Sequence, residues 1–387
     1  MTRSKWMALL LTTVAAGVIL SACGSSSDSS SSTSGSGGDE GGGAAKTDLA
    51  PFEKLVEERE APITKWPAEA PTEPVKEIAS DKLIVDITLS AEEPPALLTA
   101  EGVVEAAERL GWEGKILYTE FSAAKTVSAF EQAIALGADA VVTQGIVPSQ
   151  YKSSIKKLHD SGAILVTTYS DFPPSDEYAQ AEISENSRGF GEVGGAKAVV
   201  EAEGEGQFAI FNFPEYLVLR HQTEATQEKL EECAGCEVLP IIDITSAEAE
   251  KTMPTATSTM LQQNPDLTAF FTGIDTFVTN YQMPVVRQQG SEVGIYTYLG
   301  GKPTLEAVEK EEINAVVTFP LLWGGWAAVD NIARLFANQK PNTGGLPQRL
   351  ISTENVGEAL QTLGPKGFWD ADGFDYQGEY EKLWGLK

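Results

Sequence analysis

From residue 82 onward, short apolar runs alternate with segments whose apolar residues recur at helical spacing. Short, mostly apolar runs are typical of buried strands, whereas apolar residues repeated every three or four positions indicate helices that face a core. The first predicted strands are 82–89, 114–121, 138–144 and 163–169, and the predicted helices between them are 100–110, 125–136 and 149–159. This alternation with short loops predicts a doubly wound parallel sheet.

The same pattern restarts at Ser187 and builds a second unit. Its predicted helices are 187–201, 220–232, 247–262, 276–288 and 324–338, and its predicted strands are 206–212, 237–243, 269–273, 293–299 and 315–319. We therefore expect an α/β fold with two doubly wound parallel-sheet lobes. Ligands of such sheets bind beyond the carboxyl ends of the strands, so we expect a site between the lobes.

The chain begins with a positively charged start and an unbroken run of apolar or small residues at 7–20. A bilayer span needs about 20 apolar residues, so this run predicts a signal peptide. It ends in Leu-Ser-Ala-Cys at 20–23, which resembles the bacterial lipobox. The resemblance implies that residues 1–22 are removed and that Cys23 is lipidated. An ordinary signal peptide that ends near a cysteine is the alternative.

Two segments of different composition separate this signal from the first predicted strand. Residues 23–45 are rich in Gly and Ser, which behave as flexible coil and predict a tether. Residues 46–80 are rich in Pro, Glu and Ala, which predicts an extended lead-in with one short helix at 52–60. We expect Trp66 to pack on the folded part.

The charge of the chain excludes several partners. Its 387 residues include 28 Lys and Arg against 56 Asp and Glu, a formal charge of −28. This balance disfavours nucleic acid and anionic lipid surfaces, which both require basic patches. No phosphate-binding loop or metal-ligand cluster is evident, and His159 and His221 are the only histidines. We therefore expect no metal and no cofactor.

Two further cysteines, Cys233 and Cys236, are separated by Ala and Gly. This spacing also occurs in redox centres and in halves of zinc sites. A zinc site needs two more ligands, and a redox cysteine usually begins a helix, whereas this pair follows one predicted helix and precedes a strand. Outside the cytoplasm a local disulfide is the default, so we predict a disulfide here.

The order and spacing of several short motifs resemble the type I periplasmic binding proteins, in particular ribose-binding-like solute-binding proteins of ABC importers. The motifs are FEQAI at 130–134, GADAVV at 137–142, GAILVT at 162–167, ENSRG at 185–189, Arg220 and Ile274-Asp275. The resemblance covers about 82–337. It implies two lobes that close on a small solute, such as a sugar, and a partner ABC permease.

The resemblance also implies that the chain crosses between the lobes three times. Residues 81–183 and 319–347 then form the first lobe, and residues 184–318 and 348–387, with the tail, form the second. It implies a monomer held by its lipid anchor at the outer face of the cytoplasmic membrane. A sensory lipoprotein that signals the solute to a membrane receptor is the alternative to transport.

The loops that follow the predicted strands carry the candidate ligand contacts. These are Ser90, Glu120, Gln144, Tyr169 and Asp171 in the first lobe, Asn186, Phe213, Tyr216, Arg220, Asp275 and Gly300 in the second, and Thr318 and Phe319 at the hinge.

Four of these residues have an alternative role. Arg220 matches the arginine that binds ligand oxygens in sugar-binding relatives, and its alternative is a surface ion pair with Glu224. Asn186 and Asp275 each precede a predicted helix and are expected to cap it, whether or not they contact a solute. Tyr169 either stacks on a ligand ring or only packs.

The chain departs from its sugar-binding relatives at three places. It has Leu299 where they place an aspartate before glycine, Ile274 where they place an asparagine, and EEPP at 92–95 where they place aromatic residues. Polar groups that pair with sugar hydroxyls are the usual source of sugar selectivity. We therefore expect a solute with fewer hydroxyls than a free monosaccharide, or a modified or aromatic one.

An enzymatic function is not favoured by the sequence. The Gly-x-Ser-x-Gly motif is absent, and the two histidines have no recognisable catalytic partners. Glu120 and Asp171 form a conceivable acid–base pair, but carboxylates in the loops of a binding cleft are far more common than hydrolase pairs. A repressor of the same fold begins with a helix-turn-helix, where this chain has a secretion signal.

Overall fold

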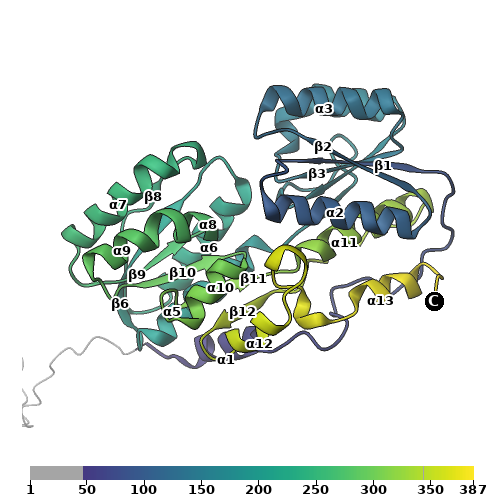
Figure 1. The fold of residues 1–387 in the computed structure, drawn as a ribbon. Coiled ribbons are helices and arrows are strands. Elements are labelled where there is room, and N and C mark those ends of the chain that lie inside the picture. Colours follow the sequence, from purple (N-terminus) through teal and green to yellow (C-terminus); the bar gives the residue numbers. More distant parts are fainter. Residues whose placement is uncertain (1–46, 343) are drawn as a thin grey trace, which may run out of the picture. The chain divides into compact units, whose positions relative to one another are not determined.

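The computed structural model describes residues 47–342 and 344–387, which include two separate β-sheets (Figure 1). The first sheet has five strands in the order β2-β1-β3-β4-β5, all parallel. Its strands are β1 (Leu83–Thr88), β2 (Glu113–Tyr118), β3 (Ala140–Gln144), β4 (Ile164–Thr168) and β5 (Ala181–Ile183). The predicted doubly wound arrangement is confirmed for this lobe.

Helices cover both faces of the first sheet. Helices α2 (Pro94–Arg109) and α11 (Leu321–Phe336) pack together on one face, and α3 (Ala123–Leu136) lies on the other (Figure 1), where it packs with α4 (Lys152–Asp160). Successive side chains of a strand point to opposite faces. Ile84 therefore joins the core beneath α2, while Val85 joins the core beneath α3 and α4.

The second sheet has the order β12-β11-β10-β9-β6-β7, with β8 also paired to β6. The strands are β6 (Glu205–Asn212), β7 (Gly235–Val238), β8 (Ile242–Asp243), β9 (Leu267–Thr272), β10 (Gly294–Tyr298), β11 (Ala315–Thr318) and β12 (Arg349–Ser352). All pairs are parallel except β11 with β12. The second predicted lobe is confirmed. Strand β12, which is antiparallel to β11, forms one edge of its sheet.

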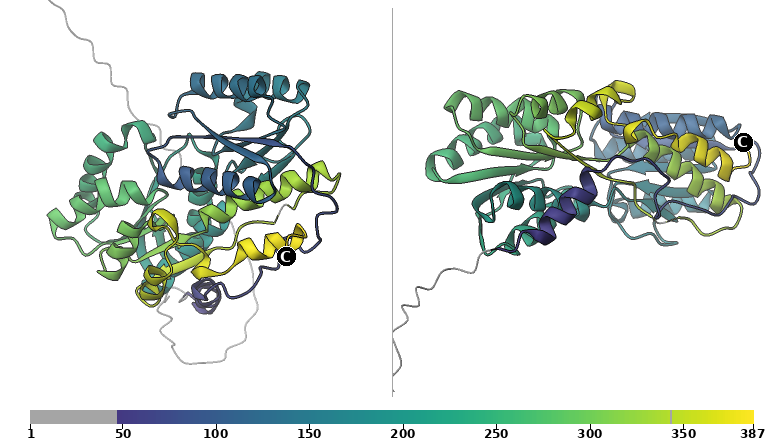
Figure 2. Two further views of the ribbon diagram at one scale, coloured as in Figure 1. Left: turned by 45° about the vertical axis from the view of Figure 1, so that its right-hand side comes forward. Right: turned by 90° about the horizontal axis from the view of Figure 1, so that it is seen from below.

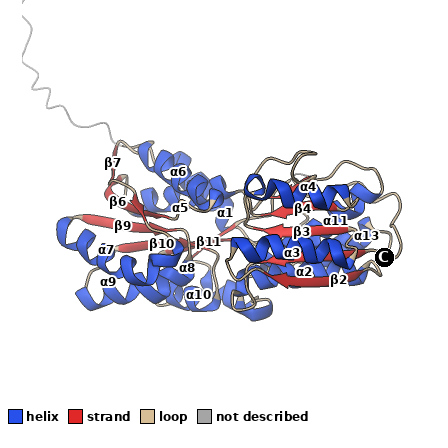
Figure 3. Cartoon of the chain, turned by 90° about the horizontal axis from the view of Figure 1, so that it is seen from above, coloured by secondary structure: helices blue, strands red, loops and turns tan. Residues whose placement is uncertain are grey.

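The second sheet is also covered on both faces (Figure 3). Helices α5 (Ser187–Glu201) and α6 (Leu217–Glu231) pack together on one side, and α7 (Ala249–Gln263), α9 (Met283–Gln289) and α10 (Lys302–Glu309) lie on the other. Gly191 allows the close approach of α5 and α6, because a Cβ at this position would lie 2.3 Å from the carbonyl oxygen of Gln222.

Several predicted elements differ from the observed ones. Strand β5 and helix α10 were not predicted, because three and eight residues show little periodicity. The helix predicted at 100–110 begins six residues earlier, at Pro94, since proline is tolerated in the first turn. The helix predicted at 276–288 is three pieces, α8 (Asp275–Phe277), a π-helical turn (Val278–Gln282) and α9.

The chain passes between the sheets at the three expected places, between β5 and α5, between β11 and α11, and between α11 and β12. Two further passages were not expected. The lead-in runs from α1 (Ala50–Glu60), which packs on α5 and β12, to β1, and the tail runs from α12 (Val356–Gln361) to α13 (Tyr376–Leu383) (Figure 2).

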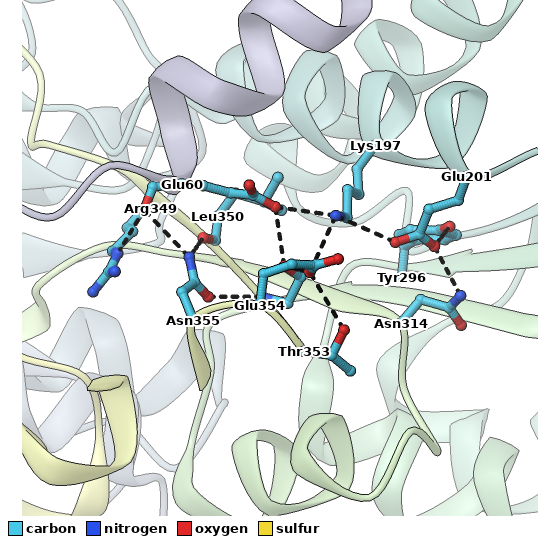
Figure 4. A network of polar contacts seen from close by, with 11 residues as sticks. Glu60, Lys197, Glu201, Tyr296, Asn314, Arg349, Leu350, Thr353, Glu354 and Asn355 are labelled. Atoms are coloured by element: carbon cyan, nitrogen blue, oxygen red, sulfur yellow. Dashed lines mark hydrogen bonds and ion pairs between the residues drawn. The ribbon is translucent and has the colours of Figure 1, made fainter. Parts of the chain in front are cut away.

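A polar network attaches the lead-in helix to the second lobe (Figure 4). Lys197 Nζ on α5 lies 3.0 Å from Glu60 Oε1 and 3.4 Å from Glu354 Oε2. The same Glu60 oxygen accepts a hydrogen bond from Ser352 at 3.0 Å, and the Glu60 carbonyl accepts one from Asn355 at 3.2 Å. The carboxyl end of α1 is therefore bound to both α5 and the end of β12.

Aromatic residues attach the rest of the lead-in to the tail. Trp66 stacks on Trp323 with ring centroids 5.4 Å apart and meets Tyr380 edge-on at 5.2 Å, so it packs on the folded part as expected. Trp326 of α11 stacks on Trp384 at 5.3 Å. The tail aromatics are therefore packing residues.

Three predictions fall on residues 1–46, namely the signal peptide 1–22, lipidated Cys23 and the tether 23–45, and they lie outside the described residues. Within the described part, Cys233 and Cys236 form the predicted disulfide. No helix of 47–342 or 344–387 is both long enough and apolar enough to cross a membrane.

Candidate ligand-binding site

A cavity of about 510 Å³ is lined by residues that follow the strands of both sheets. Leu89 follows β1, Gln144 ends β3 and Tyr169 follows β4 in the first lobe, while Ile274 and Leu299 come after β9 and β10 in the second. The carboxyl ends of parallel strands meet at one edge of a sheet, which explains why loops so far apart in the sequence converge. The position is the one expected from the strand–helix pattern.

The lining is mostly apolar. Its aromatic members are Phe121, Tyr169, Tyr216, Phe277 and Phe319, and its aliphatic members are Leu89, Pro95, Ala96, Val218, Leu219, Ala247, Ile274, Leu299 and Leu321. The polar members are Glu93, Gln144, Glu185, Gln222, Ser246 and Thr276, and Gly145 and Gly273 complete the wall. A predominantly apolar cavity with a few polar groups is typical of small-molecule sites.

Three of the polar residues carry buried acceptor atoms without a hydrogen-bond partner among the described residues. Gln144 donates from Nε2 to Asp86 Oδ1 at 3.0 Å, which fixes its amide and leaves Oε1 without a donor. Glu185 Oε2 and Gln222 Oε1 are likewise buried and unpaired. Unpaired buried acceptors are costly, so a ligand that donates hydrogen bonds is the natural complement.

Two carboxyl groups of the lining are shifted toward their protonated forms. Burial raises the pKa of Glu185 well above its usual range, and the negative charge of Asp171 adds to this. Burial also raises the pKa of Glu93, with a smaller contribution from Asp275. Titratable groups perturbed by burial and facing a cavity are typical of functional sites.

Three lining residues other than glycine have positive φ angles. These are Phe121 (54°), in the loop after β2, and Tyr169 (54°) and Leu299 (94°), which directly follow β4 and β10. Such backbone conformations cost on the order of 1 kcal/mol each and are concentrated at ligand clamps. The strained turns direct these three side chains to the cavity wall.

Four predicted ligand contacts line the cavity, namely Gln144, Tyr169, Tyr216 and Phe319. The Tyr169 hydroxyl donates to the Leu321 carbonyl at 3.4 Å, and its ring meets Phe319 edge-on at 5.0 Å. The Tyr216 hydroxyl lies 3.2 Å from Ser246 Oγ. Both rings are therefore held in place before any ligand arrives.

Five other predicted contacts are not among the residues that line the cavity. Ser90 is buried and donates to Glu120 at 3.0 Å, while Glu120 is exposed. Phe213 is buried behind the wall against Phe277. Arg220 and Asp171 are the remaining two.

Arg220 is exposed on α6, on the side of the helix turned away from Val218 and Gln222. The alternative ion pair with Glu224 is not formed in the described structure, where Glu224 lies 3.9 Å from Arg188. Asp171 Oδ2 lies 2.9 Å from His221 Nδ1 on α6, so this histidine does have a partner.

The last four predicted contacts hold the backbone around the cavity. Asn186 caps α5 by accepting from the Gly189 amide at 3.3 Å, which confirms its capping role. Asp275 does not cap a helix by its side chain; its carboxylate accepts from the Gly301 amide and from Thr304 Oγ1, both at 2.9 Å. Thr318 donates to the Leu299 carbonyl, beside Gly300 at φ 79°.

The three positions at which the sequence departs from sugar-binding relatives all lie at the cavity wall. Leu299, Ile274, and Glu93 with Pro95 from the EEPP segment line it directly. The apolar or acidic residues at these positions therefore face whatever occupies the cavity.

Glu185 and Gln222 are lining residues that the sequence reasoning did not select. Glu185 stands one residue before Asn186, and the loop conformation decides which of the two faces inward. Helix α6 begins at Leu217, three residues before its predicted start, so the inward face contains Val218, Leu219 and Gln222. The spacing of these residues is helical and could have indicated that face.

Residues 96–340 match the family described as periplasmic binding protein domain. An ABC sugar transporter subunit from Rhodobacter sphaeroides 2.4.1 is 22% identical, with a TM-score of 0.63 over 70% of this chain and 98% of its own. An ABC transporter solute-binding protein from Agrobacterium vitis with bound allitol is 18% identical, with a TM-score of 0.66 over 73% and 99%. At these identities the likeness is one of fold. A comparison with curated proteins finds no match.

Proposed function

This chain belongs to the periplasmic binding protein family, and on that premise we propose that it captures a small solute between its lobes and delivers it to an ABC permease. It is a binding protein without catalytic turnover in this proposal. A ligand favours the closed form only by binding it better than the open form, and residues of both lobes are needed for that difference.

The observation that supports this function is the shared cavity. Its walls come from Gln144 and Tyr169 in one lobe and from Tyr216 and Ile274 in the other, and its volume of about 510 Å³ suits a small organic molecule. We propose Gln144, Tyr169, Tyr216 and Phe319 as ligand contacts.

A sugar or sugar-like solute is the class suggested by the family, and the cavity wall favours a less polar member. Leu299 and Ile274 offer no hydrogen bond to a hydroxyl group. Burying unpaired hydroxyls against such residues is unfavourable. A modified or aromatic solute fits this wall better than a free monosaccharide.

The place of action is outside the cytoplasm, as for periplasmic binding proteins in general. We further propose that Cys23 carries the lipid anchor, that residues 23–45 form the tether, and that the protein works as a monomer. Sensing through a membrane receptor is the alternative use of the same closure.

Native mass spectrometry of the protein purified from its own host tests the function. We expect one small molecule bound per chain, released on denaturation, and stabilisation of the released chain when that molecule is returned. A host-purified chain without bound solute, which no sugar, polyol or aromatic solute stabilises against heat, would contradict the proposal.

A further inference from the structure

We propose that the solute is an organic cation, with an apolar or aromatic body and a protonated amine that is held by Glu185, while Glu93 adds a second acidic group to the same cavity wall. This inference rests on the proposed function and specifies its substrate class. It is carried by the juxtaposition of two carboxyl groups, three unpaired acceptors and five aromatic rings in one cavity.

The lining of the cavity carries acidic side chains and no basic one. Glu93 and Glu185 line the cavity, and no Lys, Arg or His is among its lining residues. No hydrogen bond or ion pair between either carboxyl group and a basic side chain is found among the described residues. Burial without a basic partner favours the neutral carboxyl group, and a cationic ligand supplies the counter-charge with which such a group ionises.

The buried unpaired atoms of the wall are Glu185 Oε2, Gln144 Oε1 and Gln222 Oε1. All three are oxygens, and all three accept hydrogen bonds once Glu185 is ionised. Glu185 has an exposed fraction of only 4%, so water has little access to it. An ammonium group has three donors and no acceptor, which matches this set. A carboxylate or phosphate has only acceptors and finds no basic side chain in the lining.

Aromatic side chains surround these acceptors in the cavity wall. The rings of Phe121, Tyr169, Tyr216, Phe277 and Phe319 line the same cavity. Aromatic faces attract cations and also pack against an apolar body. A bare metal ion makes no use of such a wall, and a cavity of about 510 Å³ is far larger than one ion requires.

Isothermal titration of the full chain with matched solutes tests the inference. The probes are 2-phenylethylamine with 2-phenylethanol and tryptamine with its alcohol analogue, because each pair differs only in the charged group. Allitol serves as the polyol probe. We expect each amine to bind at least tenfold tighter than its alcohol, and tighter than allitol.

Equal or tighter binding of the alcohols overturns the inference, as does the absence of binding by both amines. If allitol binds while neither amine binds, the proposal of a cationic solute is refuted, but the proposed solute-binding function stands. A co-purified solute without a basic nitrogen overturns it in the same way.

Substitutions locate the charge. Glu185→Gln and Glu93→Gln keep the shape of the side chain; we expect the first to reduce the preference for amine over alcohol by about tenfold and the second to reduce it by a smaller factor. Glu120→Gln is the control, because this exposed carboxyl group lies outside the cavity. An unchanged amine-to-alcohol ratio in both cavity variants refutes the assignment, and the retained affinity for the alcohol shows that the cavity is intact.

Discussion

Replacement of Arg334 by methionine breaks a buried ion pair within α11 whose carboxylate also binds the tail. Arg334 Nε lies 2.7 Å from Asp330 Oδ2, and Trp384 of the tail donates to Asp330 Oδ1 at 2.9 Å. The exposed fractions of the Arg334 and Asp330 side chains are 4% and 2%. Arg334→Met therefore leaves a carboxylate in the core without its counter-charge. Removing one partner of a buried pair costs about 3–5 kcal/mol of unfolding free energy.

The loss should depend on pH, with a sign set by Asp330. Burial raises the pKa of this carboxyl group even in the intact pair, and Arg334 opposes the rise. Without Arg334 the folded pKa rises further. Above about pH 4 the Asp330 carboxyl group of the unfolded chain is ionised, while that of the folded variant is still protonated. The free energy of unfolding therefore falls by about 1.4 kcal/mol per pH unit until Asp330 ionises in the folded variant as well. The loss stops growing when the folded group ionises, and its expected limit is the cost of a broken buried pair, about 3–5 kcal/mol.

Guanidinium unfolding followed by tryptophan fluorescence between pH 4 and pH 8 measures this effect. We expect the difference between wild type and Arg334→Met to be small near pH 4 and to grow toward neutrality. The double variant Asp330→Asn with Arg334→Met removes both charges and should recover most of the loss. A deficit that is the same at all pH values, or a double variant as unstable as Arg334→Met, would refute the reasoning.

Two further predictions concern packing and cross-linking. Gly325→Ala places a Cβ 2.4 Å from backbone atoms of α2, so we expect overpacking to lower the free energy of unfolding by about 2 kcal/mol. The control is Gly357→Ala, whose Cβ meets nothing within 4 Å and which should leave the melting temperature unchanged or slightly raised. Equal changes in melting temperature for the two variants would contradict the close approach of α11 to α2. Joint replacement of Cys233 and Cys236 by serine removes a cross-link with a sequence separation of three. Because the closed loop is so short, chain entropy limits the loss of unfolding free energy to about 2 kcal/mol. Thermal melting with and without reductant measures the loss, and a much larger one would show that the disulfide also maintains native packing.

The sequence predicted the two sheets because their strands and helices differ clearly in period. It also predicted a ligand site at the strand ends, and Gln144 and Tyr169 line a cavity there. Elements too short to show a period, such as β5, were not predictable in this way. Neither were the two passages made by the lead-in and the tail, since their positions depend on contacts such as that of Trp66 with Trp323.

The inward direction of individual side chains was decided only by tertiary structure. Arg220 and Gln222 lie on the same helix, yet the rotation of α6 against its sheet exposes the first and turns the second to the cavity. Glu185 and Asn186 are adjacent, yet one faces the cavity and the other caps a helix. Local pattern determines which elements form, because period and turn chemistry act over a few residues. Packing between elements determines which atoms meet, because it depends on rotations that no short segment specifies by itself.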